Sequence, residues 1–124
     1  MGATRRKLAC PRIRSVVALA PAPTVRAFDP ASVRDIKVPV TLIVGEADAE
    51  APPADGTDWL SAINPAFERL GLGAEVGHYT LLGGPGQDAP HIDTLFKDHP
   101  SVDRSMVHNT VSLATIKAME AARR

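Results

Sequence analysis

The chain has 124 residues, and its 14 lysines and arginines are balanced by 14 aspartates and glutamates. This length fits about one small domain with one core, and the balanced charge excludes the basic excess typical of proteins that bind nucleic acid or anionic lipid. Cys10 is the only cysteine, which excludes an internal disulfide and a cysteine-based metal cluster and favours a reducing, cytoplasmic setting.

Two unbroken apolar runs predict strands that are buried on both faces. The first lies within IRSVVALAPAP (13–23), with the strand itself at 13–20, and the second lies within VPVTLIVGEAD (38–48). Between them, Asp29 and Pro30 form an N-cap and first-turn pair. They predict a short helix over about 30–36.

The second half of the chain predicts a further helix, strand and helix. TDWLSAI (57–63) is helical, with Thr57 or Asp55 as its cap, and the alternating segment that follows predicts a strand at about 67–72. After a loop from Gly83 to about Pro100, a long closing helix is capped by Ser101. Its apolar stripe at helical spacing is Val102, Met106, Val107, Val111, Ala114 and Ala118.

Alternating strands and helices predict a single α/β domain with a mostly parallel sheet and flanking helices. Functional groups in such sheets gather beyond the carboxyl ends of the strands. Asp48 follows the second strand and His78 follows the third, so we expect them at the same edge. An aspartate beside a histidine suits a general base and the carboxylate that orients it. Glu46 is a weaker alternative for the acid.

Four stretches of the sequence together resemble one protein family. They are RIRSVVALAPA (12–22), IKVPVTLIVGEADAEAPP (36–53), GHYTLL (77–82) and VDRSMVH (102–108). They resemble the C-terminal portion of the α/β-hydrolases, within the dienelactone-hydrolase-like group. The resemblance implies that residues 1–124 form one partial hydrolase-like domain, with a flexible segment at 1–11.

The same resemblance implies a catalytic role for two residues. Asp48 matches the family's triad acid and His78 its triad base, in the chain order nucleophile, acid, histidine. The substrate implied is a small carboxylic ester or lactone, and no cofactor or metal is expected. No nucleic-acid or membrane partner is expected either.

The nucleophile of this family is missing from the sequence. Neither G-x-S-x-G nor G-x-C-x-G occurs in the 124 residues, and the family places this elbow upstream of the strand at 13–20. The loop after His78 also lacks the cysteine pair that similar proteins often carry, and Phe96 stands near one of those positions. We therefore expect two-thirds of a catalytic triad, and no meaningful esterase or lactonase activity from this chain alone.

A missing neighbour would leave the strand at 13–20 with an open edge. Unpaired backbone groups on an apolar edge invite pairing with another chain. We expect self-association through this strand, docking onto a separately encoded N-terminal half, or poor solubility.

Two other functions remain as alternatives to the predicted hydrolase function. One is a non-catalytic interaction module that reuses half of the hydrolase fold. The other is a small standalone enzyme in which Asp48 and His78 act as a general acid/base pair on water.

The remaining histidines give only a weak metal signal. His91, His99 and His108, with Asp88 and Asp93, fit no compact zinc motif. We expect these histidines to be surface polar residues.

Overall fold

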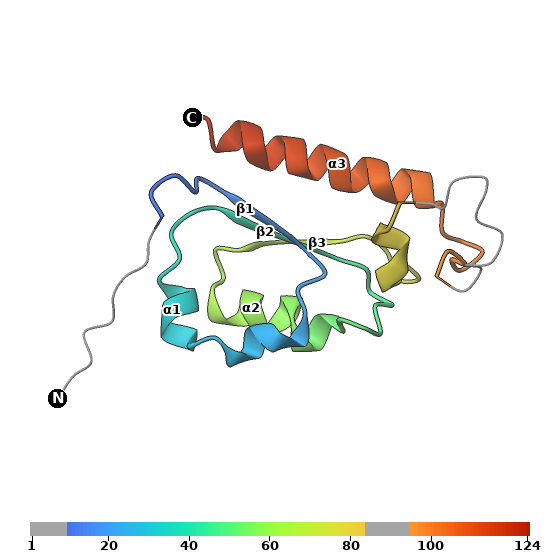
Figure 1. The fold of residues 1–124 in the computed structure, drawn as a ribbon, viewed down its shortest axis with the longest axis horizontal. Coiled ribbons are helices and arrows are strands. Elements are labelled where there is room, and N and C mark those ends of the chain that lie inside the picture. Colours follow the sequence, from blue (N-terminus) through green and yellow to red (C-terminus); the bar gives the residue numbers. More distant parts are fainter. Residues whose placement is uncertain (1–9, 84–94) are drawn as a thin grey trace.

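The computed structural model describes residues 10–83 and 95–124 (Figure 1). Most of the segment expected to be flexible, and the residues Asp88, His91 and Asp93, lie outside the described residues. In the described part, no helix is both long and apolar enough to cross a membrane.

A three-stranded parallel sheet forms the centre of the molecule, in the order β1-β2-β3. Its strands are β1 (Val16–Leu19), β2 (Val40–Val44) and β3 (Glu68–Gly71). Val16 lies opposite Val40, and Thr41 lies opposite Glu68, so all carboxyl ends meet at one edge. The sheet confirms the small α/β architecture and the expected direction of its strands.

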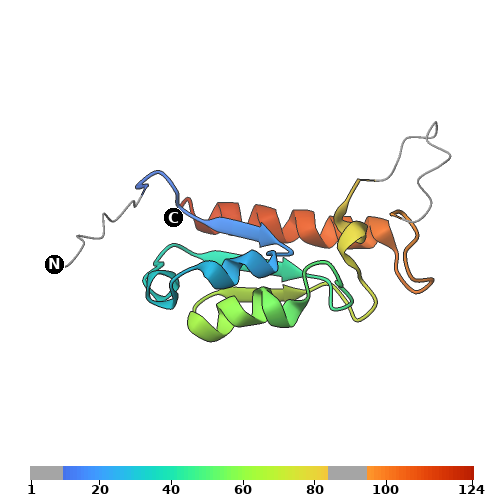
Figure 2. The same ribbon diagram turned by 60° about the horizontal axis from the view of Figure 1, so that its bottom comes forward.

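Helices cover both faces of the sheet. Figures 1 and 2 show α1 (Pro30–Arg34) and α2 (Thr57–Ile63) on one face and α3 (Arg104–Ala121) on the other. Short 3-10 helices lie in the connections, at η1 (Pro23–Ala27), η2 (Pro53–Asp55) and η3 (His78–Leu81). The helix at 57–63 has the predicted bounds, and α1 ends two residues earlier than expected.

The core lies between the sheet, chiefly β2, and the two helices α1 and α2. All residues of β2 are buried, as its β-branched run predicts. The buried cluster is Val33, Val40, Leu42, Leu60 and Phe67. Complete burial of such a side chain stabilises the fold by about 1.5–3 kcal/mol, so this cluster holds α1, α2 and the sheet together.

The prediction that the first strand is buried on both faces is wrong. β1 is an edge strand, with Val16 exposed at 37% and Leu19 at 47%. Within residues 10–83 and 95–124, no strand pairs with its outer side. The run of apolar residues is typical of a central strand, whereas β1 lies at the edge of the described sheet.

Two of the three predicted helix caps differ from the structure. Asp29 caps α1 as expected, because its carboxylate accepts the backbone N–H of Ser32. Neither Thr57 nor Asp55 caps α2: the N-cap is Gly56, without a side-chain bond. Thr57 is already inside the helix, where its side chain is buried.

The long helix begins later than expected. Asp103, not Ser101, caps α3 by accepting the backbone N–H of Met106 at 3.2 Å. Met106 is 67% exposed, whereas Val107 is buried. Successive helical residues point about 100° apart, so only one of these two neighbours can face the sheet.

Candidate functional site

The loops after β2 and β3 are joined through their backbones. The N–H of Glu46 donates to the Gly73 carbonyl and that of Ala47 to the Val76 carbonyl, both at 3.1 Å. Gly45 lies so close to the Val76 carbonyl that a Cβ atom would overlap it. These contacts hold the two loops in a set position at the carboxyl edge of the sheet.

Asp48 and His78 are brought together at this edge, as the strand order predicts. Nδ1 of His78 lies 2.8 Å from Oδ2 of Asp48, and the N–H of Ala51 donates to Oδ1 at 2.7 Å. The Asp48 side chain is 0% exposed and that of His78 is 35% exposed. A buried carboxylate is stable when its oxygens accept hydrogen bonds, and both oxygens of Asp48 do.

This geometry determines the proton arrangement on the neutral imidazole. An ionised carboxylate can only accept, so Nδ1 of His78 donates and Nε2 keeps its lone pair. The imidazole and the neighbouring ring of Tyr79 are perpendicular, with the ring centroids 5.4 Å apart. The arrangement can accept a proton at Nε2 and stabilise the imidazolium that results.

Glu46, the alternative acid, has a different partner. Arg69 binds both of its carboxylate oxygens, at 2.7 and 2.9 Å, and donates through Nε to Asp58 at 2.8 Å. The hydrogen bond from Arg69 lowers the pKa of Glu46, and Glu46 and Asp58 raise the pKa of Arg69. Glu46 therefore pairs with Arg69 of β3, and Asp48 is the carboxylate that contacts His78.

The prediction that His108 is a surface polar residue is wrong. His108 is half-buried, and its Nε2 donates to the backbone carbonyl of Thr80, in the turn that carries His78, at 2.7 Å. His99 is exposed, as expected, and bonds to Ser101. The described residues hold no group of three or more metal-ligating side chains. His108 was detectable from the sequence, because it lies three positions before the stripe residue Val111 and so shares its helix face.

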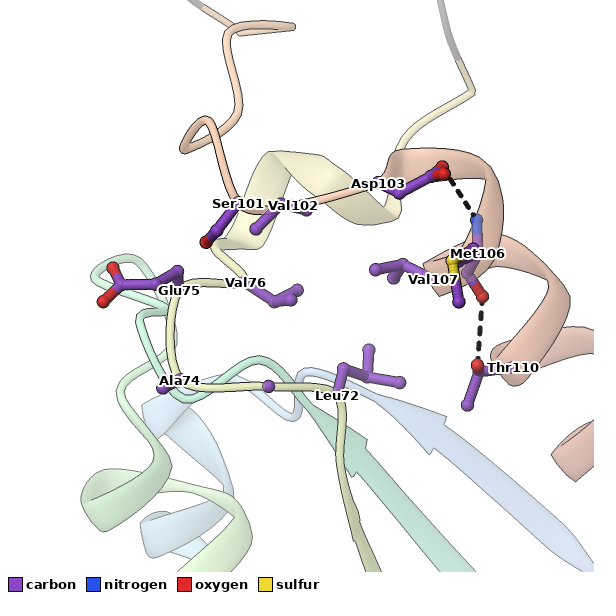
Figure 3. A pocket seen from close by; sticks show the side chains of 11 residues that line it. Leu72, Ala74, Glu75, Val76, Ser101, Val102, Asp103, Met106, Val107 and Thr110 are labelled. Carbon is purple, nitrogen blue, oxygen red and sulfur yellow. Dashed lines mark hydrogen bonds between the residues drawn. The ribbon is translucent and has the colours of Figure 1, made fainter.

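A cavity of about 390 Å³ lies between the loop after β3 and the start of α3 (Figure 3). Leu72, Val76, Met106 and Val107 line it, and the Glu75 carboxylate points away from it. Neither Asp48 nor His78 is among its lining residues. The cavity is therefore separate from the Asp48–His78 pair.

No nucleophile completes the pair within the described chain. No serine, threonine or cysteine side chain of residues 10–83 and 95–124 forms a hydrogen bond with His78. Comparisons of the chain with protein-family models, with curated proteins and with solved structures found no match.

Proposed function

We propose that Asp48 and His78 are the orienting acid and the general base of a site that hydrolyses carboxylic esters or lactones. The observation that carries this proposal is the 2.8 Å contact between Nδ1 of His78 and a completely buried Asp48 carboxylate. Such a contact fixes the tautomer in which Nε2 can take a proton from an attacking hydroxyl or thiol. The chain then corresponds to the C-terminal part of an α/β-hydrolase, in the dienelactone-hydrolase-like group.

The nucleophile in this proposal comes from a polypeptide segment outside the 124 residues. A nucleophile must approach the base to within about 2.6–3.2 Å, and the sequence contains no nucleophile elbow. A strand that paired in parallel with the free side of β1 would end at the same edge as Asp48 and His78. We therefore expect the chain alone to be inactive.

A fusion protein tests the proposal. The N-terminal half of a complete dienelactone-hydrolase-like enzyme, including its elbow, is joined ahead of Arg12, and turnover of an activated ester is measured. We expect turnover in the fusion, and a loss of about 10²–10⁴-fold in its His78→Ala variant, the contribution typical of a general base. His99→Ala is the matched control, since His99 is exposed and bonds to Ser101, not to the Asp48–His78 pair. A folded fusion whose turnover does not depend on His78 would refute the proposed role.

The unmodified chain provides a second measurement. We expect no ester turnover above that of buffer. Turnover by the chain alone that disappears in His78→Ala would contradict the need for an external nucleophile. It would favour a pair that activates water directly.

A non-catalytic interaction module is the second candidate, and the edge of β1 favours it. Val16 and Ala20 donate their backbone N–H groups to the carbonyls of Pro39 and Ile43, so those of Val17 and Leu19 point away from the sheet. Such an edge is a template for pairing with another chain. We expect concentration-dependent association in sedimentation experiments, abolished by Leu19→Lys but not by Phe28→Lys, a control at another exposed apolar residue. A soluble wild-type monomer at high concentration would contradict this candidate.

A further inference from the structure

The turn that carries His78 depends on bonds from outside the turn. The helix η3 has four residues and no side-chain cap, and short 3-10 segments have poor internal hydrogen-bond geometry. The Thr80 carbonyl accepts from Nε2 of His108, and the Thr80 hydroxyl donates to Asp98, both at 2.7 Å. The start of α3 and the segment before it therefore support η3.

Arg104, the first residue of α3, makes the largest set of these bonds. It donates from Nε and Nη2 to the Asp98 carboxylate at 2.8 and 2.9 Å. Its Nη1 donates to the carbonyls of Tyr79 and Leu82, both at 3.0 Å, and its Nη2 approaches the Leu95 carbonyl at 3.5 Å. A guanidinium group has five N–H donors, and each has an acceptor here. Arg104 thus has no donor left for a ligand.

The surroundings of Arg104 suit a permanent structural role. The side chains of Arg104 and Asp98 are only 17% and 15% exposed, and the Arg104 guanidinium lies 5.3 Å from the Phe96 ring centre. Paired hydrogen bonds between a guanidinium and a carboxylate are among the strongest in proteins. Arg104 also lowers the pKa of Asp98, so the Asp98 carboxylate stays ionised at neutral pH.

The sequence VDRSMVH brings these groups to one side of α3. Asp103 caps the helix, which makes Arg104 its first residue. Arg104, Val107 and His108 are three and four positions apart and therefore share a face. Val107 is buried, which places this face against the rest of the molecule.

We propose that Arg104 and His108 are positioning residues that hold the His78 turn so that Nδ1 meets Asp48. Arg104 acts on the carbonyl of Tyr79, directly after His78, and His108 acts on the carbonyl of Thr80. This proposal rests on the proposed function of the Asp48–His78 pair. Its test, however, requires no catalytic activity.

The test measures the His78 Nδ1–H proton by NMR in the full-length, ¹⁵N-labelled chain. A hydrogen bond to a buried carboxylate protects this proton from exchange with water. We expect Arg104→Met to speed exchange by at least about tenfold, which corresponds to about 1.4 kcal/mol. Arg104→Lys should not restore protection, because an ammonium group cannot reproduce the planar fork. Arg69→Met is the matched control, since Arg69 also binds a carboxylate through two of its nitrogens but lies on β3.

His108 provides a milder pair of variants in case Arg104→Met fails to fold. His108→Phe removes the donor to the Thr80 carbonyl and should also speed exchange, whereas His108→Gln keeps an N–H donor and should restore part of the protection. Exchange within twofold of wild type in Arg104→Met, or in His108→Phe if Arg104→Met is unfolded, would overturn the positioning role. A missing Nδ1–H signal in the wild type would instead contradict the Asp48–His78 pair itself, and with it the proposed function.

Discussion

Asp48→Asn removes the charge of the buried acid but keeps its shape. Asp48 accepts from Ala51 N–H at 2.7 Å and from His78 at 2.8 Å. Asparagine offers one oxygen that accepts and one amide group that only donates. We expect the oxygen to stay with Ala51, because the backbone N–H cannot change its role. His78 then accepts at Nδ1 and carries its proton on Nε2.

The size of the effect follows from the hydrogen bonds that change. A charge-assisted bond contributes about 1.5–3 kcal/mol and a neutral one about 0.5–1.5 kcal/mol. Both bonds of Asp48 become neutral in Asp48→Asn, and each then loses about 1–1.5 kcal/mol, so the free energy of unfolding should fall by about 2–3 kcal/mol in total. The chemical effect is larger: a protonated Nε2 cannot act as a base, and the fusion protein should lose about 10²–10⁴-fold in turnover.

The ¹⁵N chemical shifts of the two ring nitrogens report the tautomer directly, at a pH where the imidazole is neutral. We expect the proton of His78 on Nδ1 in the wild type and on Nε2 in Asp48→Asn. Asp103→Asn is the control, because asparagine and aspartate are about equally good N-caps and Asp103 is an exposed cap of α3. A wild-type proton on Nε2, or an unchanged tautomer in Asp48→Asn, would refute this account of the site.

Urea unfolding tests three further predictions. Thr57 and Thr80 are both buried, but among the described residues the Thr57 hydroxyl has no hydrogen-bond partner, whereas that of Thr80 bonds to Asp98. Thr57→Val should therefore stabilise the fold, and Thr80→Val should destabilise it, each by about 1 kcal/mol. Changes in the free energy of unfolding that have the same sign in both variants would contradict this reasoning. Arg104 lowers the pKa of Asp98, so ionised Asp98 stabilises the fold above the unfolded-state pKa of about 3.9, and this contribution is lost as the pH falls through the folded-state pKa. The stability difference between wild type and Asp98→Asn should thus stay constant from pH 7 to about pH 5 and shrink as the pH falls below about 4, and a difference that does not shrink there would exclude this linkage. Leu42→Ala, in the buried centre of β2, should cost about 2–5 kcal/mol, and a loss below about 1 kcal/mol would contradict the assigned core.

The parts of the fold that local patterns determine were predictable from the sequence. The apolar, β-branched run of β2 and the helix at 57–63 each have a strong pattern over their own length. The meeting of Asp48 and His78 followed from chain order, because parallel strands bring their carboxyl ends to one edge. A contact between residues thirty positions apart was thus deduced from the alternation of strands and helices.

The features that depend on non-local neighbours were not predictable in the same way. The run in β1 is typical of a central strand, and its open edge was expected only from the family resemblance, because the residue pattern does not show which strands lie beside it. The bonds of Arg104 were not predicted because its acceptors are mostly backbone carbonyls. Every residue has such a carbonyl, so the sequence does not show which ones accept. Part of the signal was nevertheless present, since Arg104 and His108 share a helical face with the predicted stripe residues Val107 and Val111.

The two proposed functions share one structural feature, the edge of β1 that no strand pairs with in the described sheet. Leu113 and Ile116 of α3 are 68% and 51% exposed. α3 contacts β1 and runs alongside it (Figure 2). Both proposed functions place a polypeptide against the free side of β1. They differ in whether that polypeptide brings a nucleophile to His78, so the His78-dependent turnover of the fusion protein distinguishes them.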